Sequence, residues 1–207
     1  SYPYGKMYFT RALLSDDRNN DYYGKAWRSV GETMHLISDM TVPAHVRNDG
    51  HGLQLGTSNL MKWDIDPLED TTNGGTVRKY AVYTPANLNY NQNLPAMMKD
   101  MARFTNQHFI SQDTNHRYSQ PDLSKPASYD GYIHGTVDGF DYRVARYMSA
   151  WDSFLDVRAM PNLVYDNPAL DEKVLHDQKM ILIPTAIRGS AAVLDRFLPR
   201  FKVFGSI

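Results

Sequence analysis

The sequence contains no cysteine. This absence excludes disulfide bonds, thiolate metal sites and cysteine nucleophiles. The sequence also has no apolar run near the roughly 20 residues that a membrane-spanning helix needs. Charge of one sign is not in excess, because 22 lysines and arginines stand against 23 aspartates and glutamates. With a net charge of −1, nothing in the composition favours wrapping duplex DNA or coating an anionic membrane.

The chain has 207 residues, of which 42% are apolar, and this is enough for one domain with a buried core. Several segments carry apolar residues at every third or fourth position, which is the helical period. This pattern predicts helices over 3–15, 22–41, 94–110, 142–157 and 169–198. The helices at 22–41 and 169–198 have the longest apolar patterns, so we expect both to be central.

Glycine and proline are frequent between these segments. Residues 41–93 predict a long loop with one helical turn opening at 66–69, and residues near 129–147 predict one small hairpin. The predicted fold class is therefore all-α, a single multi-helix domain over 1–207 with long loops and that one hairpin.

The sequence begins at Ser1, without a methionine or a signal peptide. We therefore expect a processed chain, or the C-terminal part of a longer one. Fourteen tyrosines and many asparagines are typical of an exported protein, so the expected location is secreted, periplasmic or at the cell surface.

Three of the seven histidines lie within one short stretch, at His35, His45 and His51. His35 and Asp39 are four residues apart, so on a helix they share one face and can hold a metal ion between them. Pro43 then ends the helix, and the other two histidines follow. Imidazole and carboxylate donors suit zinc, and the lack of thiolate favours a catalytic site over a structural one. For the first pair alone, a simple hydrogen-bonded pair is the alternative.

This stretch resembles the signature of the zinc-dependent phospholipase C and single-strand nuclease family. The resemblance rests on His-x-x-x-Asp followed by Pro43 and His45. The run 42–51 looks like a bacterial branch of that family, and Asp66-Pro67-Leu68-Glu69 matches the downstream Asp-Pro-x-Glu of that branch. The apolar run at 182–194 is also similar to it.

The resemblance implies zinc as the cofactor and five metal ligands, which in chain order are His35, Asp39, His45, His51 and Glu69. Asp39 would bridge two zinc ions, and Asp66 is the rival to Glu69. Family members also use donors before the equivalent of residue 8, but this chain has no histidine before His35. An upstream segment or a partner chain is therefore expected to supply the missing donors.

The remaining histidines have simpler explanations. His108 lies near a predicted helix end, where the helix dipole favours a cation. His116 is expected at the surface of a polar loop, His176 in a structural role, and His134 packed in a loop rather than in contact with substrate.

Two functions are consistent with these residues. The first is a zinc-dependent phosphodiester hydrolase that uses metal-activated water on a small phosphoester, a phospholipid or a single-stranded nucleic acid. The second is a non-catalytic structural or assembly protein on the same helical scaffold with a degenerate metal site. The sequence identifies no catalytic residue beyond the metal ligands and leaves open whether this chain alone is active.

Overall fold

The structure is a computed structural model that describes residues 2–17, 21–49, 53–54, 62–63, 67–111, 118–123, 130–147 and 168–198. The helices are α1 (Tyr2–Leu14), α2 (Tyr22–Asp39), α3 (Pro43–Val46), α4 (Pro67–Asp70), α5 (Gly74–Tyr80), α6 (Leu94–His108) and α8 (Glu172–Phe197). The strands are β1 (Leu53–Gln54), β2 (Lys62–Trp63), β3 (Tyr132–Val137), β4 (Phe140–Tyr147) and β5 (Pro168–Ala169).

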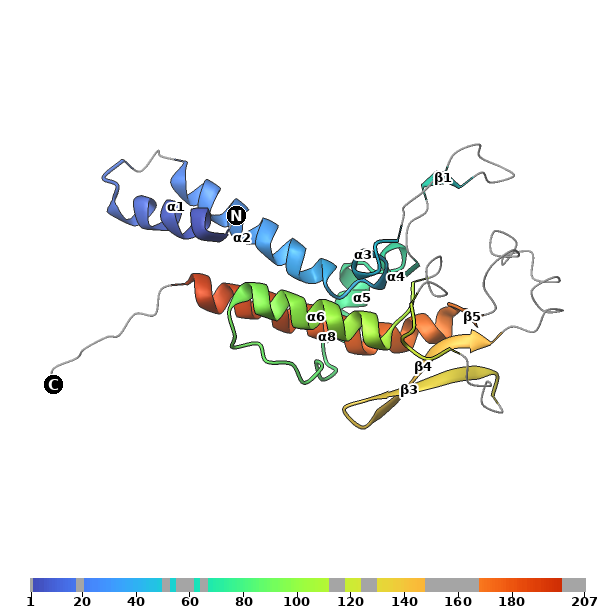
Figure 1. The fold of residues 1–207 in the computed structure, drawn as a ribbon. Coiled ribbons are helices and arrows are strands. Elements are labelled where there is room, and N and C mark those ends of the chain that lie inside the picture. The colour runs from blue at the N-terminus through green and yellow to red at the C-terminus, as the bar shows by residue number, and fades with distance from the viewer. Residues whose placement is uncertain are drawn as a thin grey trace.

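The fold is elongated along the direction of α8 (Figure 1). α6 and α8 run through the middle of the molecule, the α1–α2 hairpin lies at one end and the β3–β4 hairpin at the other (Figure 1). α8 contacts both α2 and β4. The short helices α3, α4 and α5 gather near the C-terminal end of α2 (Figure 1). This arrangement brings together the elements that carry most of the predicted metal ligands.

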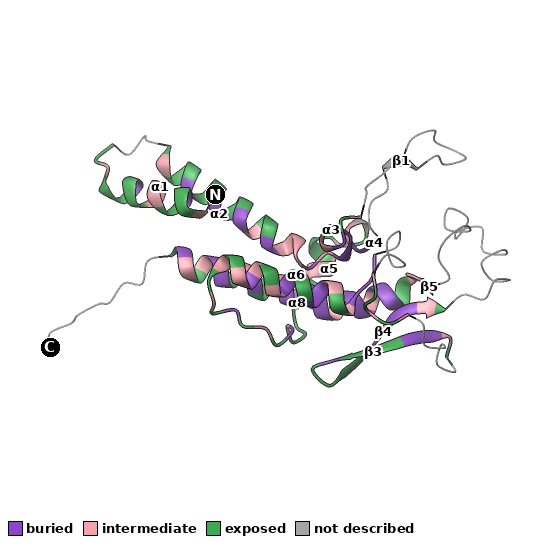
Figure 2. Cartoon of the chain, in the orientation of Figure 1, coloured by how far each residue is buried: buried purple, intermediate pink, exposed green. Residues whose placement is uncertain are grey.

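α8 contributes to both clusters of buried apolar residues. Ile181 and Leu182 pack with the sheet and the end of α6, whereas Val193 and Phe197 pack with α2 and the first part of α6. Buried residues therefore follow α8 along most of its length (Figure 2). The prediction of a central, buried C-terminal helix is confirmed, with Pro184 buried inside it.

Four of the predicted helices are present with shifted ends. The segments 3–15, 22–41, 94–110 and 169–198 correspond to α1, α2, α6 and α8. Within the described part of the chain, none of the helices combines the length and the apolar character needed to cross a membrane.

The all-α prediction is wrong, although the molecule is mostly helical. β3, β4 and β5 form a three-stranded antiparallel sheet, and β1 pairs with β2. The hairpin expected near 129–147 is present as β3 and β4. The helix predicted over 142–157 is a strand as far as residue 147, and residues 148–157 lie outside the described residues. Tyr142 and Val144 are both buried on one face, so their spacing of two is the strand period.

α5 was also missed, because Gly74 and Gly75 indicated a loop. The Asn73 side chain accepts a hydrogen bond of 3.0 Å from the backbone N–H of Thr76 and thereby caps the helix. The helical turn expected at 66–69 is present as α4.

Candidate metal centre

The C-terminal end of α2 carries the first two predicted ligands on one face. Nε2 of His35 lies 3.8 Å from Oδ2 of Asp39, which is longer than a hydrogen bond. The His35 side chain is 76% exposed and the Asp39 side chain 18%. The predicted pairing by helical spacing is therefore present, but the two side chains are not hydrogen-bonded to each other.

α3 brings His45 to the end of α2. The chain turns at Val42, and Pro43 occupies the start of α3, where its missing N–H costs no helical hydrogen bond. In this position Nδ1 of His45 lies 3.4 Å from Oδ1 of Asp39. A short turn thus places the second histidine beside the carboxylate that the sequence had paired with the first.

Arg47 anchors α3 to the end of α6. Its side chain is 1% exposed and donates to the backbone carbonyls of Asn106 (2.8 Å), Phe109 (3.0 Å) and Gln120 (2.6 Å). Burial lowers the pKa of Arg47 to about 10, so the side chain stays charged at neutral pH. The role of Arg47 has no local pattern in the sequence, because its hydrogen-bond partners are far away in the chain.

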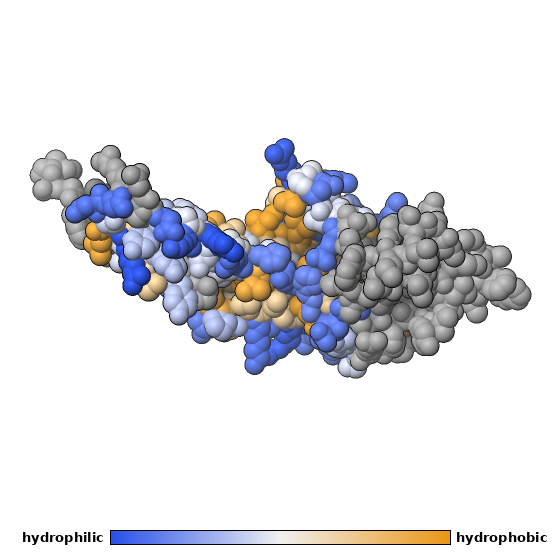
Figure 3. Space-filling model, turned by 90° about the horizontal axis from the view of Figure 1, so that it is seen from above, coloured by the Kyte–Doolittle hydropathy of each residue, from blue (hydrophilic) through white to orange (hydrophobic). Residues whose placement is uncertain are grey.

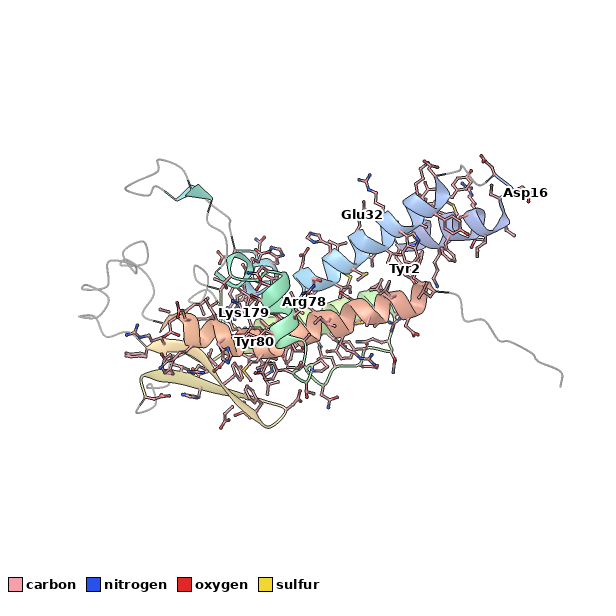
Figure 4. All side chains as sticks on the ribbon, turned by 180° about the vertical axis from the view of Figure 1, so that it is seen from behind. Tyr2, Asp16, Glu32, Arg78, Tyr80 and Lys179 are labelled. Atoms are coloured by element: carbon pink, nitrogen blue, oxygen red, sulfur yellow. The ribbon has the colours of Figure 1, made fainter. Side chains whose placement is uncertain are left out.

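α4 brings Glu69 to the other side of His45. Oε1 of Glu69 lies 3.4 Å from Nε2 of His45. The turn after α4 is held by Lys179, which donates to the carbonyl of Thr71 at 3.2 Å and to its hydroxyl. Lys179 lies where α8 passes α5 (Figure 4), and burial lowers its pKa. A long-range contact from α8 therefore supports the position of Glu69.

The described ligands form a row, in the order His35, Asp39, His45 and Glu69. His51 and Asp66 lie outside the described residues, and Glu69, the rival of Asp66, lies next to His45. Two ligand atoms of a tetrahedral zinc with bonds of about 2.0–2.1 Å are separated by about 3.3 Å. The separations of His45 from Glu69 and from Asp39 are both 3.4 Å, and both fit this spacing. Among the described residues, no three His, Asp or Glu side chains converge closely enough to hold one metal ion.

A cleft of about 650 Å³ opens beside this row. His35, Asp39 and Glu69 line one part of it. The remaining wall is mainly apolar and comes from α2, the α4–α5 region and α8: Met34, Val42, Leu68, Val77, Leu182, Ile183, Ala186, Ile187, Ala191 and Leu194. From above, apolar side chains gather near the middle of this face of the molecule (Figure 3). Three of the four described candidate ligands thus line an apolar groove, and His45 is not among them.

The other histidines lie away from this row, and His116 is outside the described residues. His176 packs in the fold as predicted, with Nδ1 contacting the Tyr80 hydroxyl. The prediction of a loop position for His134 is wrong, because His134 lies on β3 and pairs with Asp130 at 3.1 Å. His108 is near the end of α6, but burial lowers its pKa and so favours the neutral ring.

Comparison of the chain with protein-family models, with curated protein sequences and with solved structures finds no match. The resemblance to the zinc-dependent phospholipase C and nuclease family therefore stays a prediction from the motifs.

Proposed function

We propose that this chain is a zinc-dependent phosphodiester hydrolase with its zinc between His45 and Glu69. The observation that carries the proposal is the 3.4 Å separation of His45 Nε2 and Glu69 Oε1, together with the cleft of about 650 Å³ that Glu69 helps to line. One imidazole and one carboxylate supply two of the three protein ligands that a catalytic zinc uses. His51 is the third ligand expected from the sequence.

The chemistry divides between the metal and the chain. A zinc ion at this place would supply an activated water and positive charge for the phosphoryl oxygens. The chain's own residues present the donors and hold them in place: Arg47 fixes α3, and Lys179 fixes the turn after α4. Both anchoring side chains are buried in the fold.

The cleft favours a substrate with an aliphatic part. Its wall is built largely from leucine, isoleucine, valine and alanine side chains of α8 and its neighbours. Among the described residues that line it, none is Phe, Tyr or Trp, whereas proteins that bind single-stranded nucleic acid usually stack bases on such rings. A phospholipid is therefore the substrate class that we propose, ahead of a nucleic acid.

The test is zinc-dependent hydrolysis by the full chain. Activity on a chromogenic phosphodiester, a short-chain phospholipid and single-stranded DNA is measured for the wild type, His45→Ala and Glu69→Gln. We expect the wild type to hydrolyse the phospholipid. In both variants the rate of hydrolysis should fall to the rate measured with zinc ions alone. His134→Ala, at a histidine outside the row, is the control and should retain full activity. Equal rates in wild type and His45→Ala would refute the proposal.

The second candidate is a non-catalytic structural or assembly protein on this scaffold. It is favoured by one observation: the described donors meet in pairs, and no three of them converge. Such a protein would bind zinc through His45 and Glu69 without turnover. Zinc uptake with no hydrolysis of any of the three substrates would select this alternative.

A further inference from the structure

One face of α8 lines the cleft along the second half of this helix. The residues that line it recur in pairs at every fourth position, from Leu182 and Ile183 to Leu194, and all of them are apolar except Ser190. Residues four apart stand one above the other on a helix, so these side chains form a continuous stripe. At a rise of 1.5 Å per residue, the stripe is about 18 Å long.

Part of this stripe is exposed, although its side chains are apolar. Ile187 is 39% exposed, and Ala191 is exposed as well. From above, apolar side chains gather near the middle of this face of the molecule (Figure 3). An exposed apolar surface that continues into a cleft is typical of a groove that binds a ligand.

The two ends of the cleft are lined differently. At one end Leu182 packs in the same cluster as Leu68, which precedes Glu69 in α4. At the other end Leu194 and Met34 both pack against the second cluster. The proposed zinc site therefore lies at the Leu182 end, and the cleft continues from there along α8 to an apolar end.

The carboxylates of Asp39 and Glu69 line the cleft, and among the described lining residues none is lysine or arginine. In the metal-free chain these carboxylates repel an anionic head group. The wall from α8 contributes a single hydroxyl, at Ser190, whereas the N–H and C=O groups of a bound peptide would need many hydrogen-bond partners. An aliphatic chain whose head group has no net negative charge therefore fits the cleft better than an anionic amphiphile or a peptide.

We propose that the cleft holds one acyl chain of a lipid without net negative charge, laid along α8 with its end at Leu194. A bilayer core about 30 Å thick contains two acyl chains end to end, so one chain is about 15 Å long and fits the stripe. Ala191, one turn before Leu194, is the residue whose size decides how far the chain reaches. The head group at the Glu69 end rests on the proposed function, whereas binding of the chain needs neither zinc nor hydrolysis.

The first test is the binding of single-chain phosphocholines to the metal-free protein. Amphiphiles of increasing alkyl length are titrated by calorimetry, each below the concentration at which it forms micelles. We expect one amphiphile per protein molecule and an affinity that rises about two- to fourfold with each CH₂ group. The rise should stop once the alkyl chain is as long as the stripe. An alkyl sulfate of the same length should bind less tightly, because its head group is anionic.

Ala191→Phe is the variant that tests the position of the chain, and its rise in affinity should stop at a shorter alkyl length than in the wild type. Ala81→Phe is the matched control, because Ala81 is exposed and does not line the cleft. The inference is overturned by no binding, by several amphiphiles per molecule, by tighter binding of the sulfate, or by an unchanged length dependence in Ala191→Phe. A stable dimer that excludes the amphiphile would assign the groove to a second copy of the chain and overturn it as well.

The second test is hydrolysis by the zinc-loaded protein, and it separates a failure of this inference from a failure of the proposed function. The ratio of long-chain to short-chain phospholipid hydrolysis should fall by about tenfold or more in Ala191→Phe, because contact with several CH₂ groups is lost. An unchanged ratio would overturn the inference. A wild type that hydrolyses no phospholipid would refute the proposed function, and the binding titration would still decide whether the cleft holds an acyl chain.

Discussion

At the scale of single residues, Asp39 occupies a position that is unfavourable for folding. It is the last residue of α2, where the helix macrodipole is negative. The structure describes every residue of α2, and the last turn of this helix contains no basic residue to offset the charge. A carboxylate that is partly buried at this end is better explained by its contact with His45 than by helix stability.

This reasoning predicts that Asp39→Asn stabilises the fold. The substitution removes the charge and keeps the shape, so at pH 8 the free energy of unfolding should rise by roughly 0.3–1 kcal/mol. Urea denaturation measures the change. Glu32→Gln on the same helix, whose side chain is 54% exposed and paired with Arg28, should change stability by less than about 0.5 kcal/mol. A loss of more than about 1 kcal/mol in Asp39→Asn would instead make Asp39 a structural residue.

At the scale of elements, the crossing of α2, α6 and α8 sets the position of the ligand-bearing end of α2. Gly189 of α8 lies against Ile37 and Met101. A Cβ at this glycine would be 2.7 Å from Cγ2 of Ile37 and 2.8 Å from Cε of Met101. A side chain at this position would therefore overlap the Ile37 and Met101 side chains unless they moved. Ile37 is two residues before Asp39, so the contact fixes the segment that leads to the candidate site.

We predict that Gly189→Ala destabilises the protein although alanine is the better helix former. The overpacked contact should cost about 1–3 kcal/mol, against a gain of about 1 kcal/mol from helix propensity. Gly31 on α2 is the matched control, because no heavy atom of the described residues lies within 4 Å of its would-be Cβ. Gly31→Ala should stabilise by up to about 1 kcal/mol. Equal effects of the two substitutions in urea denaturation would contradict this account of the crossing.

The elements also show which parts of the fold could be predicted from the sequence. In α2, α6 and α8, apolar residues recur at the helical spacing over a long stretch, and such patterns identify helices well. α5 was missed because its two leading glycines looked like breakers and its cap is one asparagine. β4 lies within the predicted hairpin, but its residues from 142 onward also predicted a helix, because a few apolar residues fit both periods over a short stretch.

The sequence predicted only those contacts of the candidate site that join residues close together in the chain. The spacing of His35 and Asp39 follows from the helix, and Pro43 indicated the turn before His45. Which nitrogen of His45 faces which carboxylate depends on how α3 and α4 pack. That packing depends on Arg47 and Lys179, whose contacts are made across the fold and have no signature in the local sequence.

At the scale of the whole molecule, α8 joins the two apolar clusters and also forms the long wall of the cleft. Leu182 belongs to the cluster with the sheet, whereas Leu194 packs against the cluster with α1 and α2, and both line the cleft. The groove thus runs beside the junction of the two clusters, with His35, Asp39 and Glu69 at its edge. The fold places an apolar surface and a polar end side by side, and the proposed phospholipid substrate would need both.

Zinc binding by the full chain tests the central claim most directly. The metal content of the wild type and of His45→Ala is measured after exposure to zinc and removal of the excess, with His134→Ala as the control. The account predicts that His45→Ala binds about one zinc equivalent less than the wild type, because one imidazole of a site with about three protein ligands is lost. The control should match the wild type. Equal zinc content in wild type and His45→Ala would contradict the assignment of a metal site to His45 and Glu69.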